Sequence, residues 1–208
     1  MLQTQTVEPR AFSLLIDLNN IPQLKEAGLV GGTALSLYFG HRISDDLDFF
    51  CINTFDSEKI VTGLKEKFGE KFKARTVNPR VGIFSFVDEV KIDIVYHSHV
   101  MLKPFQEIEG LRFFSKEDII AMKIQAILGR GKKKDFWDIA ELLQHYTVQD
   151  FIDFHRQKFP NQFLLISVPL AMIYFSDAEE DEDPVSLKGQ TWDSVKSLIS
   201  KKVRKFLS

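Results

Sequence analysis

The sequence predicts an α+β protein, in which an α/β core over residues 1–113 is followed by a helical region over residues 114–208. Two observations support this prediction. Three consecutive runs between Phe72 and Tyr96 are rich in branched and aromatic residues, which is typical of strands. After Phe114, apolar residues recur at helical spacing instead, so we place a domain boundary there.

The elements of the first region can be placed in order. A helix over Ala11–Leu24 precedes the stretch Gly31–Phe50, which has the pattern of turn, helix, loop and strand. Ser57 is expected to cap a helix ending at Phe68. The three strand-like runs that follow are Phe72–Val77, Val81–Val87 and Val90–Tyr96. Because Asp88 and Glu89 supply a turn, the last two runs should form an antiparallel hairpin.

The second region is predicted to be helical throughout. Capping residues precede three helices, and these are Ser115 before Lys116–Leu128, Thr147 before a helix through Lys158, and Thr191 before the last helix. Between them, Phe163–Phe175 is predicted to be a buried helix interrupted or kinked at Pro169. Ser176–Pro184 is expected to be a solvated acidic loop, since it lacks the ligand spacing of a calcium-binding loop.

Composition excludes several classes of protein. The net charge of −2 argues against a uniformly basic nucleic-acid surface, so any RNA contact must come from local patches. With Cys51 as the only cysteine, neither a disulfide framework nor a cysteine-rich zinc site can form. No signal-peptide pattern is present, and the longest apolar run is too short to span a bilayer. We therefore expect a cytoplasmic protein without a membrane partner.

The stretch Gly31–Phe50 carries the first functional signal. Gly31 and Gly32 allow the backbone to approach another group closely, and Thr33 is expected to cap a short helix that stops at Gly40. In the strand that follows, Asp46 and Asp48 share one face. Two carboxylates placed in this way repel each other unless a cation lies between them.

A third carboxylate lies on a later strand. Asp93 shares a strand face with Lys91 and Val95. A solvent-facing aspartate would be the ordinary interpretation of this position if the first motif were absent.

Together these motifs resemble those of the DNA polymerase beta-like nucleotidyltransferases, and more closely the abortive-infection AbiEii toxin family. The resemblance rests on Gly31–Leu35 and Ser44–Phe50. It implies a mixed sheet flanked by helices. It also implies that Asp93 is the third carboxylate beside Asp46 and Asp48.

The helical region extends the resemblance. Further matches to the family are Lys123, Ala126, Ile127, Arg130, Lys134, Asp135, Asp138, Ile139, Phe175–Glu179 and Thr191–Lys196. The match implies that Lys123 binds nucleotide phosphates and that Asp135 is a catalytic or substrate-activating carboxylate. Asp138 is expected to cap or brace its helix. Removal of the Lys123 charge should weaken NTP binding while changing thermal stability little.

These expectations define a site for nucleotidyl transfer. Asp46, Asp48 and Asp93 would hold Mg²⁺, which prefers carboxylate and phosphate oxygens. Backbone N–H groups of Gly31, Gly32 and Thr33 would bind phosphates at a helix N-terminus, with Ser44 in the adjoining loop. The glycines do not match a Walker A loop, so a P-loop NTPase is excluded.

The predicted function is Mg²⁺-dependent transfer of an NMP from an NTP to an acceptor hydroxyl. By resemblance the acceptor is tRNA, the protein is a toxin, and a separately encoded antitoxin is implied. The basic loop with Arg130, Lys132, Lys133 and Lys134 is the candidate RNA contact. Two alternatives stay open: a small-molecule, antibiotic-type nucleotidyltransferase and a catalytically silent binding module.

Overall fold

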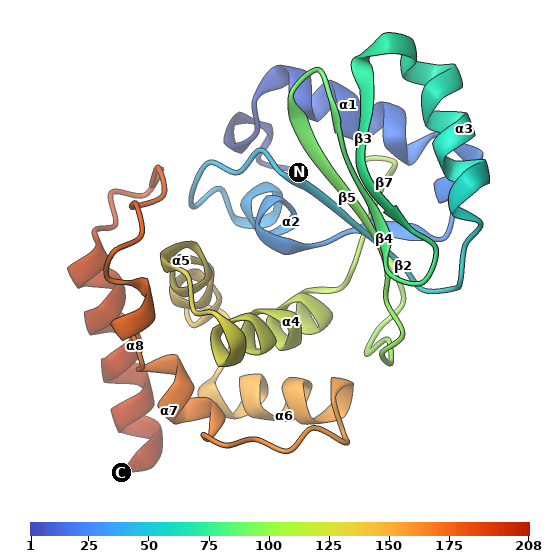
Figure 1. The fold of residues 1–208 in the computed structure, drawn as a ribbon. Coiled ribbons are helices and arrows are strands. Elements are labelled where there is room, and N and C mark those ends of the chain that lie inside the picture. Colours follow the sequence, from blue (N-terminus) through green and yellow to red (C-terminus); the bar gives the residue numbers. More distant parts are fainter.

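A seven-stranded mixed sheet with the order β3-β4-β5-β2-β1-β7-β6 lies at the centre of the computed structural model, which describes residues 1–208 (Figure 1). Two strand pairs, β2–β5 and β1–β7, are parallel, and the others are antiparallel. The strands are β1 (Ala27–Leu29), β2 (Leu47–Cys51), β3 (Phe72–Asn78), β4 (Gly82–Val87), β5 (Val90–Tyr96), β6 (Gln106–Ile108) and β7 (Leu111–Phe113). This architecture confirms the predicted α+β class.

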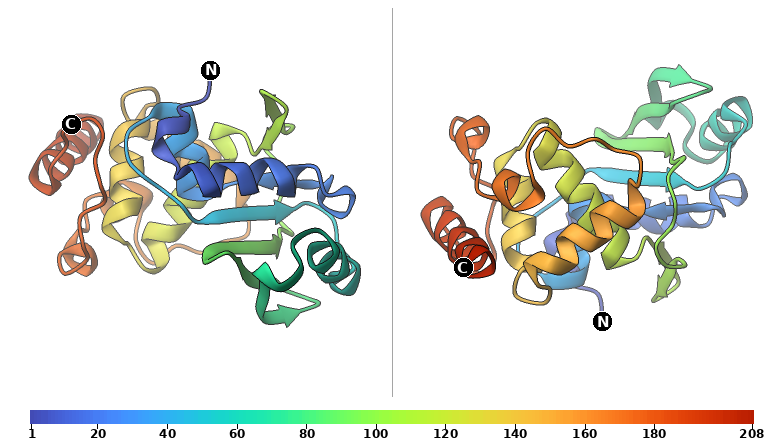
Figure 2. Two further views of the ribbon diagram at one scale, coloured as in Figure 1. Left: turned by 90° about the horizontal axis from the view of Figure 1, so that it is seen from above. Right: turned by 90° about the horizontal axis from the view of Figure 1, so that it is seen from below.

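Helices cover the sheet from two sides. The helices are α1 (Pro9–Asn19), α2 (Gly31–Phe39), α3 (Ser57–Phe68), α4 (Lys116–Gly129), α5 (Lys133–Leu142), α6 (Val148–Lys158), α7 (Val168–Met172) and α8 (Trp192–Leu207). In Figures 1 and 2, α1 and α3 lie on one side of the sheet, and α4 and α6 lie on the other. None of these helices combines the length and the hydropathy that a membrane crossing requires.

The alternation of side chains along the central strands separates core from site. Leu47 and Phe49 on β2, like Ile92 and Ile94 on β5, are fully buried in the core. Asp48 and Asp93 point to the opposite face, because successive side chains of a strand alternate. The fold thus places the predicted functional carboxylates on the face of the sheet that α4 approaches.

Local signals for turns and helix ends are largely confirmed. Gly40 ends α2 in the left-handed conformation, with φ of 67°. Asp88 and Glu89, with φ of 46° and 71°, form the tight turn between β4 and β5. The side chains of Ser115, Thr147 and Thr191 accept hydrogen bonds from the first turns of α4, α6 and α8.

Several predicted details are wrong. Thr33 is not a cap, because α2 already begins at Gly31, and α3 is capped by Asp56 instead of Ser57. The predicted helix over Phe163–Phe175 shrinks to α7, and the side chains of Phe163 and Leu165 are 86% and 95% exposed. An apolar run was therefore mistaken for a buried helix.

The acidic loop Ser176–Pro184 also differs from the prediction, because part of it is docked. Asp181 accepts a hydrogen bond from the backbone N–H of Lys133, and Asp183 lies 2.9 Å from the Lys133 ammonium. Negative charge at the N-terminus of α5 is stabilised by the helix dipole, which explains why this loop is held there.

The predicted domain boundary falls where strand β7 ends and α4 follows. One hydrophobic core of 47 buried residues nevertheless runs through both regions. The division into domains over residues 1–113 and 114–208 stays a prediction.

Candidate active site

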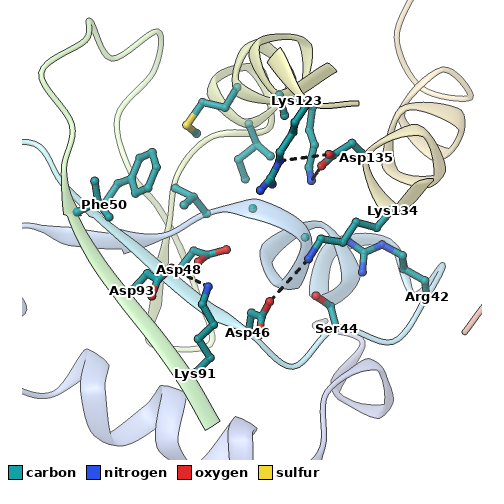
Figure 3. Close-up of a pocket in the computed structure, with 18 residues that line it drawn as sticks. Arg42, Ser44, Asp46, Asp48, Phe50, Lys91, Asp93, Lys123, Lys134 and Asp135 are labelled. Carbon is teal, nitrogen blue, oxygen red and sulfur yellow. Dashed lines mark hydrogen bonds and ion pairs between the residues drawn. The ribbon is translucent and has the colours of Figure 1, made fainter. Parts of the chain in front are cut away.

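A cavity of about 310 Å³ opens between strands β2 and β5 on one side and helices α4 and α5 on the other (Figure 3). Polar side chains from both regions of the chain line it. An apolar wall of Phe50, Val95, Ile119, Met122 and Ala126 completes the lining. Residues far apart in the sequence therefore meet around one concave, strongly charged space.

The three predicted metal ligands line this cavity. Asp48 and Asp93 are direct neighbours, because β2 and β5 run parallel with these two residues in register. Asp46 lies just before β2, and its side chain is 45% exposed. Asp45, in contrast, turns away and accepts a hydrogen bond from the backbone N–H of Glu8.

The electrostatics of the carboxylates are unfavourable without cations. Burial raises the pKa of Asp48 above the ordinary value, and the nearby Asp93 and Asp46 carboxylates raise it further, against the opposing effect of Lys91. One oxygen of Asp93, Oδ1, is buried and has no hydrogen-bond partner. A hard divalent cation would satisfy this oxygen and offset the repulsion.

The donor set fits Mg²⁺, which takes carboxylate oxygens and substrate phosphates. Asp46, Asp48 and Asp93 face one cavity but are not gathered into a preformed three-ligand cluster. Ammonium groups contact two of them: Lys91 Nζ lies 2.7 Å from Asp93 Oδ2, and Lys134 Nζ lies 3.7 Å from Asp46 Oδ2.

The glycine turn lies against the carboxylates. Gly31 has φ of 74°, and a Cβ atom there would stand 2.9 Å from Oδ2 of Asp48. A Cβ on Gly32 would collide with the guanidinium of Arg42. No side chain caps the N-terminus of α2, so its first N–H groups remain available to an anion at the cavity wall.

Replacing Gly31 by Ala should therefore damage the site as well as the backbone. We expect a loss of about 1–3 kcal/mol in the free energy of unfolding, since a non-glycine residue is strained at positive φ. Gly40→Ala is the matched control, because Gly40 has φ of 67° outside the cavity. Thermal unfolding should shift similarly for both variants, but only Gly31→Ala should also lose nucleotidyl transfer. Equal activity of the two variants would contradict this assignment.

Thr33 and Ser44 play different parts. The Thr33 hydroxyl is buried and donates a hydrogen bond to the backbone carbonyl of Asp46. Ser44 Oγ lies 3.0 Å from the Thr33 hydroxyl oxygen. Ser44 lines the cavity, but the Thr33 side chain does not. Thr33 thus fixes the loop that presents Asp46, and only its backbone N–H can serve an anion.

Lys123 belongs to a buried ionic network. Its ammonium lies 2.8 Å from Asp135 Oδ1 and 2.7 Å from Asp138 Oδ2, and its side chain is only 9% exposed. Burial alone would lower the pKa of Lys123, but the two carboxylates outweigh burial and raise it. The side chain lines the cavity, and its two ion pairs join α4 to α5.

Asp138 is the centre of this network. Arg42 binds both of its oxygens, at 2.7 and 2.9 Å, and His41 Nε2 lies 2.8 Å from Oδ1. Although burial would raise the pKa of Asp138, Arg42 and Lys123 hold it well below its usual range. Asp138 does not line the cavity. The arrangement agrees with the bracing role that the sequence favoured.

Asp135 is also buried and lines the cavity, and its Oδ1 accepts a hydrogen bond from Lys123. Its second oxygen accepts a hydrogen bond from the backbone N–H of Lys132 and so caps α5. The structure brings Asp135 to the site, with both oxygens already engaged.

The predicted RNA-contact residues separate into two groups. Arg130 and Lys134 line the cavity, and Lys132 is exposed beside them. Lys133 instead is buried and paired with the acidic loop. Lys133 is therefore not available to RNA.

Two charged cavity residues, Arg42 and Lys91, have no role predicted from the sequence. Arg42 clamps Asp138 from the loop after α2, a contact across 96 positions that no local pattern reveals. Lys91 was placed on the correct strand face beside Asp93, and this shared face was the available signal.

Solved structures share this fold. JHP933 from Helicobacter pylori is similar with a TM-score of 0.61 and 18% identity, over 96% of this chain and 92% of that one. MenT4, the nucleotidyltransferase toxin Rv2826c of Mycobacterium tuberculosis H37Rv, gives a TM-score of 0.61 and 12% identity, over 93% and 82% of the two chains.

Sequence comparison supplies the class of protein. Residues 14–197 match the family described as "Nucleotidyl transferase AbiEii toxin, Type IV TA system". The mixed sheet, the carboxylate cavity and this match together define a nucleotidyltransferase. The chain belongs to the AbiEii family. An uncharacterized protein of Aquifex aeolicus (strain VF5), aq_aa25, is 29% identical over 86% of this chain and 87% of its own length.

Proposed function

We propose that this enzyme transfers an NMP from an NTP to a hydroxyl of RNA, with tRNA as the acceptor and Mg²⁺ as the cofactor. The observation that supports this most strongly is the in-register pairing of Asp48 with Asp93 in one cavity with the uncapped N-terminus of α2. Such an arrangement offers oxygen ligands for a cation and N–H groups for phosphates side by side.

Each group of residues has a distinct task in this proposal. Asp46, Asp48 and Asp93 would hold Mg²⁺, which supplies charge neutralisation and polarises the attacking hydroxyl. Backbone N–H groups at the start of α2 would bind the β- and γ-phosphates. The hydroxyl oxygen forms a bond to the α-phosphorus as the bond to the bridging oxygen breaks, and pyrophosphate leaves.

Residues 114–208 would complete the site. Lys123, Lys134 and Asp135 reach the cavity from this region, opposite the carboxylates of β2 and β5. We propose that the pairs of Lys123 with Asp135 and Asp138 hold α4 against α5, that Arg42 links this network to the first region through Asp138, and that phosphate contact by Lys123 is secondary. An enzyme that uses NTP and tRNA is expected to work in the cytoplasm.

The family description names a toxin–antitoxin system. We therefore propose a toxic activity and a separately encoded antitoxin as a partner. Modification of tRNA by an NMP would give such a toxin its effect, because an altered acceptor could not serve translation.

The reaction can be tested with total RNA. The protein is incubated with each α-labelled NTP in turn, Mg²⁺ and total RNA, and the labelled fraction is separated by size. We expect label in the tRNA fraction with one or more NTPs. Label confined to small molecules would favour the antibiotic-type alternative, and a complete absence of labelling would favour a silent binding module.

Charge at the rim of the cavity should control RNA use. The double variant Arg130→Ala/Lys132→Ala removes one charge that lines the cavity and a second, exposed charge two positions along the same loop. We expect weaker RNA labelling. The plot of log affinity against log salt concentration should also become less steep, by about one unit of slope for each phosphate that the variant no longer binds.

The matched control is Lys25→Ala/Lys65→Ala, which removes two exposed lysines away from the cavity. This control should label RNA normally. If the rim variant showed the same RNA affinity and salt dependence as the control, the basic loop would not be the RNA contact.

A further inference from the structure

Lys91 is a cation inside the carboxylate site, and the proposed reaction gives it no task. Its ammonium lies 2.7 Å from Oδ2 of Asp93, in a pair whose side chains are only 34% and 16% exposed. Both residues line the cavity. An exposed ion pair on a protein surface contributes little, but this one lies where the proposed metal ligands converge.

The position of Lys91 follows from the strand register. Leu47 pairs with Ile92 in the parallel ladder, so Lys91 stands one step earlier on β5 and Asp46 one step earlier on β2. The next step brings Asp48 beside Asp93. Lys91 therefore occupies the fourth corner of a group whose other three corners are carboxylates.

The ammonium contacts Asp93 and acts on the other two carboxylates at longer range. Lys91 is within electrostatic reach of Asp48, Asp93 and Asp46. Figure 3 shows its side chain extending among the three labelled aspartates. No other lysine contacts Asp93, and Lys134 approaches Asp46 more loosely, at 3.7 Å. Lys91 thus supplies the direct ion pair to Asp93, and it is the lysine that lies between the carboxylates of β2 and β5.

We propose that Lys91 is a built-in counter-ion that competes with the divalent cation for Asp48 and Asp93 and moves to the triphosphate when metal and NTP bind together. This inference rests on the proposed function. A cation that binds Oδ1 of Asp93 lies beside the ammonium on Oδ2 and repels it, and the four-carbon stem of Lys91 allows the ammonium to swing out of the group. A phosphate provides the displaced charge with a new partner.

Two consequences follow for binding. Metal alone must pull Lys91 from its carboxylates without compensation, so metal should bind weakly to the free enzyme. Metal with NTP meets no such penalty, so each should strengthen the binding of the other, and this coupling is necessarily reciprocal. An enzyme built in this way would assemble its metal site chiefly when substrate is present.

The test measures Mn²⁺ binding to the full-length chain by electron paramagnetic resonance, with and without a non-hydrolysable α,β-methylene NTP. Lys91→Met keeps most of the stem and removes the charge. We expect it to bind Mn²⁺ alone more tightly than the wild type by roughly tenfold, because a competing charge beside the ligands is gone. The tightening produced by the nucleotide should be smaller in Lys91→Met than in the wild type.

Lys73→Met is the matched control, because Lys73 is an exposed strand lysine outside the cavity, and it should behave as the wild type. Equal or weaker binding of Mn²⁺ alone by Lys91→Met would overturn the proposal, and would mark Lys91 as a group that positions Asp93 for the metal. If neither protein bound Mn²⁺ even with the nucleotide, the metal assignment itself would fail and the Lys91 proposal with it. Binding to the wild type that Asp48→Asn abolishes would uphold the metal assignment whatever Lys91→Met shows.

Discussion

Replacement of Asp48 by Asn is expected to abolish nucleotidyl transfer while the protein stays folded. Asp48 pairs in register with Asp93 on the neighbouring strand, and its carboxylate lies against Gly31 at the cavity wall. The loss should exceed the roughly 10–100-fold that removal of an outer-shell partner costs a metal site. Activity is measured with an α-labelled NTP under saturating Mg²⁺ and RNA.

The stability of Asp48→Asn should not fall with its activity. The pKa of Asp48 is raised in the folded state, so its ionised form is disfavoured there, and above the folded pKa this lowers the free energy of unfolding. Asparagine removes that cost, so the thermal midpoint at neutral pH should stay the same or rise. Asp46→Asn should lose activity as well.

Asp45→Asn is the matched control, since Asp45 is exposed and its carboxylate bonds the backbone of Glu8. It should retain transfer. Near-normal transfer by Asp48→Asn would refute its role as a metal ligand, and an unfolded Asp48→Asn would show that the carboxylate serves the fold.

The second large effect is expected for Lys123→Met. The sequence alone suggested little change in stability, but the structure reverses that expectation. Removal of the ammonium leaves two buried carboxylates, Asp135 and Asp138, without a shared partner. Loss of one member of a buried ion pair costs about 3–5 kcal/mol, so the free energy of unfolding should fall by that amount.

Chemical denaturation measures this change. Lys65→Met, at an exposed position on α3, is the control and should unfold as the wild type does. The double variant Lys123→Met/Asp135→Asn should be more stable than Lys123→Met, because it removes one stranded charge. Unchanged stability of Lys123→Met with weakened NTP binding would restore the phosphate-binding role.

Local chemistry explains why most of the sheet region could be predicted. Gly40 ends a helix because it adopts positive φ freely, and the polar pair Asp88-Glu89 between two strand-like runs marked a two-residue hairpin turn, although both residues carry a Cβ and adopt positive φ there. Period-two alternation placed Asp93 on the face opposite Ile92 and Ile94. The strands β1, β6 and β7 were missed because three residues each are too few to show a period.

What could not be predicted depends on tertiary contacts. The partners of Lys123 and Asp138 lie on other elements, and the register that brings Asp48 beside Asp93 is set by sheet topology. The docking of the acidic loop on Lys133 likewise joins residues about 50 positions apart, beyond the reach of local sequence patterns. The sequence could therefore nominate the site residues, but not say which of them were already paired.

Parallel reactions with α-labelled and γ-labelled NTP test most directly whether the cavity transfers a nucleotidyl group. We expect the α-label to appear in the acceptor only with Mg²⁺ and only with an intact Asp48, while the γ-label is released in pyrophosphate. Transfer of the γ-label to the acceptor, or α-transfer that persists in Asp48→Asn, would contradict nucleotidyl transfer in this cavity.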